Sequence, residues 1–525
     1  MDSSSLLTSG TTAIIVGVLS VFSALRFISN RKLHPNEPVI LPSWIPFIGH
    51  LLGMALQGGR YIKRLGLSRP NEPIFTLPVP GSRIYVVTDP VLAAAVQRNS
   101  KSLSFTPLVP DITKRVLGLD DKTVKVVRQN LDPEPGDPRG FLADMHDLVY
   151  TSLGPGQYLT QLSCDASQEL CVQLAEFAKS SLAATTESSP VDLLEWMRHN
   201  VAIGTANYLF GPSNPISNSP QLEQDFWAFD HGLGGLLIGL APSITASKAY
   251  HGRERVVRAL MEYLQNGHDK AASQLVQDRI RIERAYDMND EMIARSALSF
   301  LFAGIVNTTT TTFWVILRTF ADKELLTEVR REILEAIGKS RHAHVSPNAL
   351  SLATLKECCP KLTAVFRESL RIGSENFSVR LIKEDTMLAN KYFLAKGAVV
   401  QIAGGVIHGD RSIWGHDVNE FNPKRFLDQK SRSSGFHPAA FRGFGGGKTL
   451  CPGRHFATNE ILLFAAMIIY GFEITDEDKQ PVRVPAKNDR VMPVHILEPS
   501  QADRPQVIIK PRDEMATVEA LVIVP

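Results

Sequence analysis

Residues 441–457 form a glycine-rich segment that runs through one cysteine, Cys451, into an apolar stretch. Three consecutive glycines at 445–447 favour a tight loop that lies flat against another group, because glycine is costly in most other settings. The apolar stretch at 454–470 predicts a helix, which places Cys451 at the end of the loop, just before that helix. Backbone N–H groups and a helix N-terminus lower the pKa of a thiol, so we expect Cys451 to be a thiolate, the form that binds metals.

A single thiolate is enough for a metal site when the metal brings its other ligands. Haem does so, because the porphyrin supplies the nitrogens around the iron. A cysteine thiolate on one side of the iron then favours O–O cleavage on the other. The segment therefore indicates a haem-thiolate site with Cys451 as the axial ligand.

Three other readings of this segment are weaker. The run Gly447-Lys448-Thr449 resembles the end of a phosphate-binding loop, but that motif needs glycine at 442, where the chain has arginine. Cys451 and His455 could share a helix face as part of a zinc site, yet a structural zinc takes four protein ligands and no others lie nearby. A lone cysteine can also be an inert buried thiol.

Two upstream motifs accompany the cysteine segment. Glu368 and Arg371 have the spacing E-x-x-R, and the run 421–426 (Phe-Asn-Pro-Lys-Arg-Phe) has the spacing P-x-R-F. An isolated E-x-x-R is usually a solvated helix pair. With the spacing Phe444-x-x-Gly447-x-x-x-Cys451-x-Gly453, however, the three motifs resemble those of the cytochrome P450 family, in order, from about residue 30 to about 512.

This resemblance implies the cytochrome P450 fold, a haem b cofactor and a set of cofactor-binding residues. The axial iron ligand is Cys451. Arg380 is expected to contact a haem propionate, because the segment 141–156 carries neither the tryptophan nor the arginine that family members usually place there. The remaining residues that we assign to cofactor binding are Phe444, Gly447, Gly453, Glu368, Arg371 and Arg425.

Residues 292–318 form the longest apolar helical run, interrupted by Ala303-Gly304. Family members carry A-G-x-[DE]-T on a helix across the haem, and alignment on these two residues puts Val306 for the acid and Asn307 for the alcohol. A shift by one residue gives Asn307 and Thr308 instead, and we favour the first register. Asn307 and Thr308 are the candidate catalytic residues. Threonine hydroxyls at 308–312 can also bond to carbonyls one turn earlier and bend the helix.

The sequence around Asn307, with Phe313-Trp314, resembles the branch that holds sterol 7α-hydroxylases and prostacyclin synthase, in which asparagine also replaces the alcohol. That branch contains both monooxygenases and an isomerase. Two alternatives therefore stay open: an isomerase or dehydratase that uses neither O2 nor NADPH, and a haem-binding carrier or sensor. Stoichiometric NADPH consumption separates the first alternative from a monooxygenase.

Composition excludes some partners. The 56 basic and 54 acidic side chains give a net charge of +2, which argues against a nucleic-acid surface. Five cysteines without framework spacing fit a protein that faces a reducing cytosol. No linker or internal repeat divides the chain after residue 50, so we predict one large domain.

The N-terminus predicts a membrane anchor. Residues 6–25 are almost uncharged and just long enough to span a bilayer, and the following Arg26, Arg31 and Lys32 place the downstream side in the cytosol. A cleaved signal peptide is the alternative. Prolines between 35 and 46 indicate a stiff hinge. The expected organisation is an anchor at 1–28, a hinge at 29–50 and a haem-thiolate catalytic domain at 51–525, in the endoplasmic reticulum membrane.

The rest of the chain predicts a mainly α fold with small β-sheets. Residues 74–77 and 83–87 predict a β-hairpin, Pro90 opens a helix through Val96, and 133–138 is expected to be a surface loop. The apolar, glycine-rich stretch 232–242 is expected to be a loop between helices. It is either part of the core or, by resemblance, lies over the substrate channel, where it can dip into the membrane.

These observations predict a monooxygenase that oxidises a lipophilic small molecule, such as a terpenoid, a steroid-like compound or a polyketide of secondary metabolism. Electrons are expected from NADPH through a separate cytochrome P450 reductase, because no flavin domain is found in the chain. Lys448, Arg442 and Arg425 are candidates for the basic face that docks this reductase.

Overall fold

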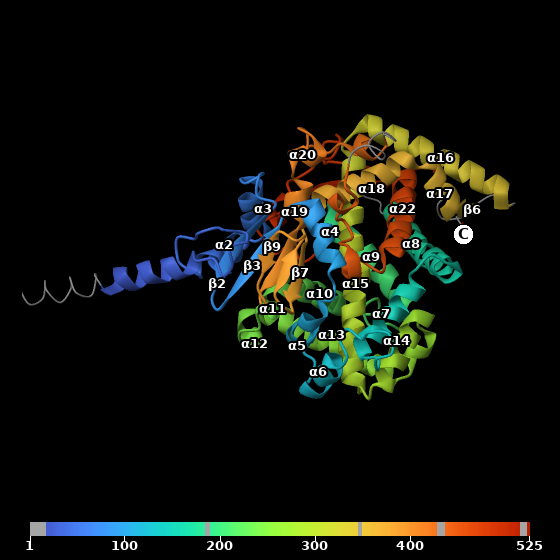
Figure 1. The fold of residues 1–525 in the computed structure, drawn as a ribbon. Helices are drawn as coiled ribbons and strands as arrows, with labels where there is room; N and C mark the ends of the chain where they lie inside the picture. Colours follow the sequence, from blue (N-terminus) through green and yellow to red (C-terminus); the bar gives the residue numbers. More distant parts are fainter. Residues whose placement is uncertain (1–16, 184–188, 345–348, 428–435, 515–521, 525) are drawn as a thin grey trace, which may run out of the picture.

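The computed structural model describes residues 17–183, 189–344, 349–427, 436–514 and 522–524. Helices dominate it, and small sheets lie to one side, as the sequence predicted (Figure 1). The first helices are α2 (Gly49–Gln57), α3 (Gly59–Leu67), α4 (Pro90–Arg98), α5 (Val109–Leu117), α6 (Asp121–Arg128), α7 (Phe141–Ser152), α8 (Gln157–Ala183), α9 (Leu193–Phe210), α10 (Pro220–His231), α11 (Leu233–Ile238) and α12 (Pro242–Thr245). They are followed by α13 (Ser247–Gln265), α14 (Gln274–Ala285), α15 (Asp290–Phe320), α16 (Lys323–His344), α17 (Leu352–Cys358), α18 (Pro360–Gly373), α19 (Gly404–His408), α20 (Arg411–Trp414) and α22 (Arg454–Gly471).

The largest sheet joins residues 39–104 to residues 377–403. Its strand order is β1-β2-β3-β10-β7-β4, and β3 pairs with β10 in parallel, with Ile84 opposite Val399. The predicted hairpin is confirmed as β2 and β3, which are antiparallel. The strands are β1 (Val39–Ile40), β2 (Ile74–Val79), β3 (Ser82–Val87), β4 (Leu103–Ser104), β5 (Val191–Asp192), β6 (Ala349–Ser351), β7 (Phe377–Ile382), β8 (Thr386–Leu388), β9 (Tyr392–Leu394), β10 (Val399–Ala403), β11 (Phe472–Thr475), β12 (Gln506–Pro511) and β13 (Val522–Val524).

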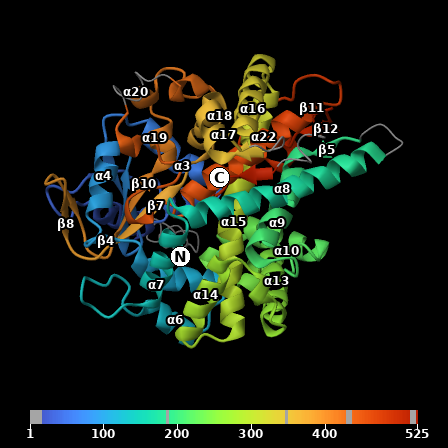
Figure 2. The same ribbon diagram turned by 90° about the vertical axis from the view of Figure 1, so that its right-hand side faces the viewer.

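Helix α15 runs through the middle of the helical part of the molecule (Figure 1 and Figure 2). The Asn289 side chain caps its first turn by accepting a hydrogen bond from the Met292 backbone N–H, and Asp290 and Glu291 add negative charge there. The helix packs against α9, α13, α18 and α22. It is the one described helix long and apolar enough to cross a membrane, but most of its side chains are buried inside the protein. Its position fits a core helix.

The predicted anchor at 6–25 lies mostly outside the described residues. From Gly17, the first described residue, to Ser29 the chain is an apolar helix, which projects from the body in Figure 1. Its side chains are largely exposed, including Val18 at 64% and Phe27 at 72%.

The prediction of a loop at residues 232–242 is wrong. The glycine-rich stretch 232–242 was expected to be irregular, but most of it forms helix α11, and α12 begins at its last residue, Pro242. Gly239 ends α11 in a left-handed conformation (φ 73°), and Pro242 opens α12. The loop at 133–138 is irregular, as expected.

Candidate active site

A cavity of about 570 Å³ lies between α15, the cysteine loop and β7. Its wall is largely apolar, with polar side chains at a few points. The Cys451 residue, the small residues Ala303 and Gly304, and the C-terminal segment at 494–496 all contribute to the wall. The apolar lining includes Phe105, Val149, Leu153, Leu209, Phe300, Phe377, Phe456, Ala457 and Ile461.

The loop before Cys451 is held by backbone contacts. The Cys451 N–H donates to the carbonyl of Phe444 (2.9 Å), and the Tyr150 hydroxyl of α7 donates to the carbonyl of Leu450. Phe444 and Gly453 line the cavity beside the cysteine, whereas Gly447 does not. The cysteine is therefore held at the cavity wall by a backbone hydrogen bond within the loop and by the Tyr150 side chain of α7.

Gly446 and Gly447 lie against Gln97 of α4, and this contact explains the glycine run. A Cβ atom at Gly446 would come within 2.2 Å of Gln97 Nε2. Gly447 has a φ of 61°, in the left-handed region that favours glycine. We expected the glycines to lie flat against a bulky group, and in the structure that group is the Gln97 side chain.

The pKa of the Cys451 thiol differs from our expectation. Burial raises it, against a backbone hydrogen bond to Gly453 and the charge of Arg454, which both act to lower it. The helix N-terminus is therefore not enough to produce a thiolate in the protein alone. A bound metal cation would supply the missing stabilisation, because metal binding and ligand deprotonation are coupled.

One face of α15 lines the cavity. Ala303 and Asn307 are exposed on it, and Thr308 also contributes to the wall. Val306 is fully buried and is not part of the wall. The Thr309, Thr310 and Thr312 hydroxyls donate to carbonyls one turn earlier, as the sequence suggested.

Asn307 ties α15 to the C-terminal segment. Its Oδ1 accepts a hydrogen bond from the Ile496 backbone N–H (2.9 Å). The side-chain oxygen of Asn307 is thus used by the protein. No described residue accepts from Nδ2, which is left for groups inside the cavity. This contact could not be predicted from the sequence, because Ile496 is far along the chain and donates through its backbone.

Glu368 and Arg371 form a fully buried pair on α18. Two hydrogen bonds of 2.7 Å join the guanidinium to the carboxylate, and the side chains are 0% and 1% exposed. Arg425 approaches the same carboxylate at 3.3 Å. Arg371 also donates to the His408 carbonyl, and the His408 ring accepts from the Arg442 backbone N–H. The network thereby reaches the start of the cysteine loop through His408.

Comparisons with known proteins agree with this geometry. A family model described as Cytochrome P450 matches residues 247–497, close to half of the chain. The cytochrome P450 monooxygenase nodJ of Hypoxylon pulicicidum is 28% identical over 453 residues, which cover 84% of each chain. The chain belongs to the cytochrome P450 family.

Further relatives of this P450 come from animals and from fungi. Cytochrome P450 7B1 of Mus musculus is 25% identical over 483 residues, or 88% of this chain and 89% of the relative. A shorter stretch of 194 residues is 31% identical to a bifunctional cytochrome P450/NADPH–P450 reductase of Fusarium oxysporum, covering 36% of this chain and 17% of that protein. The protein is a haem-dependent monooxygenase, and family members bind the haem iron through a cysteine thiolate.

Two buried arginines fit the acidic edge of a haem. Arg380 lines the cavity, and burial lowers its pKa to about 10. Arg442 is 0% exposed; burial, and then the charge of Arg380, lower its pKa to about 10 as well. Arg442 Nε is buried without a hydrogen-bond partner. Two neighbouring buried cations of this kind suit carboxylates, and haem carries two propionates.

Part of the predicted reductase-docking face of this P450 is wrong, because two of its three side chains are not at the surface. Arg442 lies in the interior and Arg425 is inside the Glu368 network, so neither is at the surface, whereas Lys448 is exposed. Reasoning from the sequence missed the burial of Arg442 near Arg380. Its neighbours Gln97 and His408 come from distant segments, and the residue occupies no position in the family motif.

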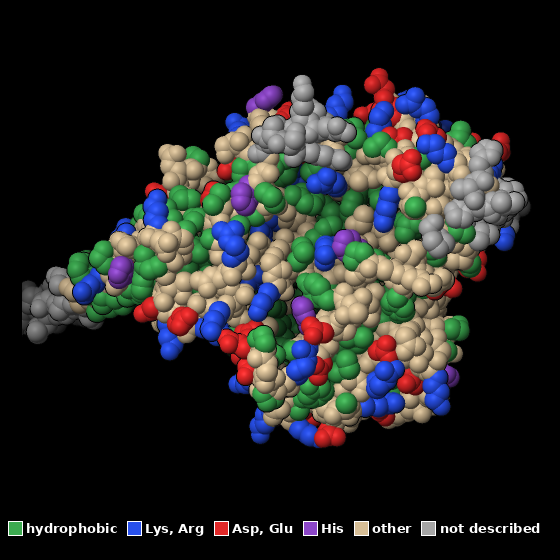
Figure 3. Space-filling view, turned by 45° about the vertical axis from the view of Figure 1, so that its right-hand side comes forward, with side chains coloured by type: hydrophobic (Ala, Val, Ile, Leu, Met, Phe, Trp, Pro, Cys, Tyr) green, Lys and Arg blue, Asp and Glu red, His purple; other side chains and the backbone are tan. Residues whose placement is uncertain are grey.

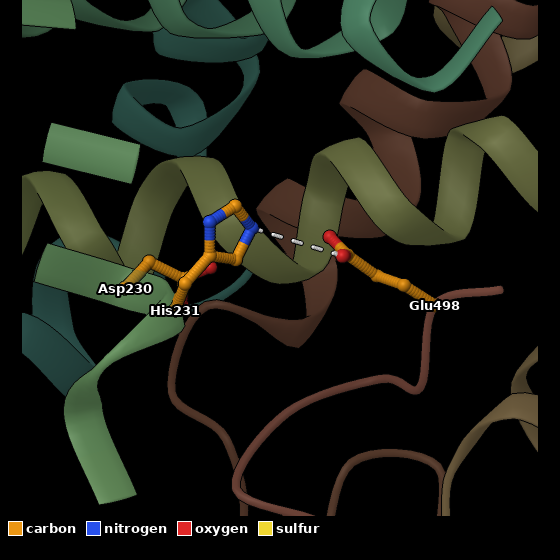
Figure 4. Close-up of side chains that lie close together, drawn as sticks. All are labelled: Asp230, His231 and Glu498. Atoms are coloured by element: carbon orange, nitrogen blue, oxygen red, sulfur yellow. Dashed lines mark ion pairs between the residues drawn. The ribbon is translucent and has the colours of Figure 1, made fainter. Parts of the chain in front are cut away.

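A second cluster of potential metal ligands lies near the C-terminal segment (Figure 4). His231, at the end of α10, and Glu498 point toward one another at 3.9 Å, with Asp230 beside them. Arg198 Nη2 lies 2.6 Å from the Glu498 carboxylate and 2.7 Å from His231 Nε2. The Arg198 guanidinium therefore already binds both the His231 ring and the Glu498 carboxylate. We interpret the cluster as a structural ion-pair network of this P450.

Proposed function

We propose that this P450 is membrane-anchored and oxidises a lipophilic small molecule of secondary metabolism, using electrons from an NADPH–cytochrome P450 reductase. The observation that carries this proposal is the largely apolar cavity with Cys451 and the small-residue face of α15 in its wall. Such a cavity binds its ligand mainly by excluding water, and a few polar groups orient it.

The residues of the chain have distinct roles in this proposal. Cys451 would hold the haem iron, and Arg380 and Arg442 would hold the propionates. Haem with a thiolate ligand supplies the activation of O2. The apolar wall orients the substrate and excludes water, and Asn307 and Thr308 present polar groups on the side of α15.

The reductase proposal is supported by the relative from Fusarium oxysporum, whose name joins a cytochrome P450 to an NADPH–P450 reductase. The decisive experiment is to express this chain with a reductase in a host, feed candidate terpenoids, steroids and polyketides, and analyse the products. Incorporation of isotopically labelled O2 with matching NADPH consumption supports the proposal. A product formed without either would favour the isomerase instead.

The membrane proposal is supported by exposed apolar residues at one side of the molecule. In Figure 1 the N-terminal helix and α12 lie on the same side, and hydrophobic side chains cover the helix in Figure 3. The exposed fraction is 75% for Trp44, 70% for Leu240 and 80% for Ile244. We propose that this side contacts the endoplasmic reticulum membrane, with the catalytic domain in the cytosol.

A fluorophore at Ile244 tests this orientation in the full chain. In vesicles, Ile244→Cys labelled with an environment-sensitive fluorophore should be quenched by a quencher attached to lipid, because its side chain would lie among acyl chains. Leu334→Cys on α16 is the matched control, since Leu334 is also apolar and 56% exposed. Equal quenching at both positions would contradict the proposed orientation.

Asn307 should control the coupling between NADPH oxidation and product formation. Asn307→Ala removes the cavity donor and the bond to Ile496, so we expect haem binding to persist while more NADPH is diverted to hydrogen peroxide. Asn307→Asp keeps an acceptor for the Ile496 N–H but loses the amide donor. Comparison of the two variants therefore separates the contact with Ile496 from donation into the cavity. The measurement is peroxide formed per NADPH oxidised. Coupling equal to the parent in both variants would move the role to Thr308.

A further inference from the structure

Glu460 is a fully buried carboxyl group on α22 that the site described above does not use. Its Oε1 accepts a hydrogen bond from the Tyr208 hydroxyl of α9 at 3.2 Å. Its Oε2 has no hydrogen-bond partner among the described residues. The hydroxyls of Thr205 on α9 and Thr308 on α15 lie beside the same carboxyl group. Three helices thus meet around one acidic side chain, whose Oε2 can form a further hydrogen bond.

This carboxyl group lies directly behind the cavity wall. Tyr208, Thr308 and Ile461 line the cavity, whereas Glu460 does not. Gly304 lets α9 approach α15 here, since a Cβ atom at that position would be 3.2 Å from Thr205 Cγ2. Thr308 therefore has the acid on one side and the cavity on the other.

The surroundings of Glu460 favour its neutral form. Burial raises its pKa to about 8, although hydrogen bonds from Tyr208, Thr205 and Thr308 act to lower it. Tyr208 is the titratable side chain that faces it from α9, and burial raises the pKa of that phenol well above its usual value. From α15 it meets threonine, and on its own helix its neighbour Asn459 donates to Ser163 of α8. A pKa raised to about 8 makes the neutral acid the main form of Glu460 at pH 7.

We propose that Glu460 supplies protons to the cavity through the Thr308 hydroxyl, in place of the acid that Val306 does not provide. This inference rests on the proposed site. Monooxygenation combines R–H, O2, two electrons and two protons to give R–OH and water. Thr308 gives its hydroxyl proton to the oxygen that leaves as water and takes the proton of Glu460. The resulting carboxylate regains a proton from solvent water. Glu460 is thus a positioning residue that acts through Thr308.

The test uses the haem-loaded full chain with a cytochrome P450 reductase, NADPH and O2, and no added substrate. Oxygen is then reduced either to hydrogen peroxide or to water, and only the second route needs O–O cleavage with proton delivery. Glu460→Gln keeps the size and the hydrogen bond to Tyr208 but has no proton to give. Water formation should fall roughly 10²-fold, the lower end of general acid effects, with more peroxide per NADPH. The reduced, CO-bound spectrum should stay that of the parent.

The pH profile adds a readout that a structural role would not change. In the parent, the peroxide share should rise as pH increases through about 8, because the neutral acid is lost there. In Glu460→Gln this step should be absent. Glu332→Gln is the matched control: Glu332 is also buried with a raised pKa, but it accepts bonds from the first N–H groups of α18, away from the cavity. That variant should keep the parent profile.

Two further measurements keep the inference testable if Glu460→Gln binds haem poorly. Thr308→Val removes the relay hydroxyl and should raise the peroxide share while leaving Glu460 in place. Infrared difference spectra should show a protonated carboxyl band at pH 7 in the parent and in Thr308→Val, absent in Glu460→Gln. A parent without that band, or a Thr308→Val variant with the parent's peroxide share, would overturn the proposal. A parent that consumes no O2 with NADPH while showing the band would instead count against the proposed function.

Discussion

Cys451→Ala is expected to abolish the absorption band of the reduced, CO-bound protein that is typical of thiolate-ligated haem. The reason is that the Cys451 residue lies in the cavity wall, while the other described cysteines, Cys164, Cys171, Cys358 and Cys359, are buried elsewhere. Without the thiolate, the electron donation that favours O–O cleavage is also lost, and monooxygenation should stop. The measurement is a CO difference spectrum on purified protein.

Two companion variants separate ligation from folding. Cys164→Ala removes a buried thiol from α8, and the thiolate spectrum should be unchanged. Cys451→His offers a nitrogen ligand at the same position and should retain haem with an altered spectrum. A parent-like spectrum in Cys451→Ala would show that another residue binds the iron.

Glu368→Ala should produce little haem-loaded protein. The substitution leaves the Arg371 guanidinium buried without its carboxylate, and breaking one partner of a buried ion pair costs roughly 3–5 kcal/mol. The same change removes an acceptor from Arg425. Since Arg371 also holds the His408 carbonyl, the loop that leads to Cys451 should lose its support. Haem content and the midpoint of urea unfolding report the effect.

An exposed pair with the same spacing provides the control. Asp278 and Arg281 on α14 are also three residues apart, but the arginine side chain is 72% exposed. Arg281→Ala should therefore change stability by about 1 kcal/mol or less. Normal haem content and an unchanged unfolding midpoint in Glu368→Ala would contradict a structural role for the buried pair.

Local sequence signals were enough to predict much of this fold. The hairpin at β2 and β3, the helix opened by Pro90 and the long α15 each carry their pattern within a short stretch of chain. The stretch at 232–242 was predicted wrongly, because its glycines suggested a loop while the apolar residues between them form the short helix α11. Packing against α5 and α13 stabilises a helix there that propensity alone disfavours.

The site was predictable only where a motif marks it. Cys451 and the Glu368 pair stand in recognisable spacings. The burial of Arg442 against Gln97, the contact of Asn307 with Ile496 and the surroundings of Glu460 all depend on segments brought together by the fold. The Cys451 pKa also went against the prediction, since burial outweighs the helix N-terminus and cannot be judged from neighbouring residues.

The parallel pairing of β3 with β10 has a consequence for biosynthesis. The N-terminal hairpin cannot complete its sheet until Val399–Ala403 has left the ribosome. At about 5–20 residues per second, the roughly 300 residues between the two strands take about 15–60 s to translate. During that time one edge of β3, with its free N–H and C=O groups, can pair with other chains. Nascent chains of this protein should therefore need chaperone protection until late in translation, and truncation before β10 should yield aggregates.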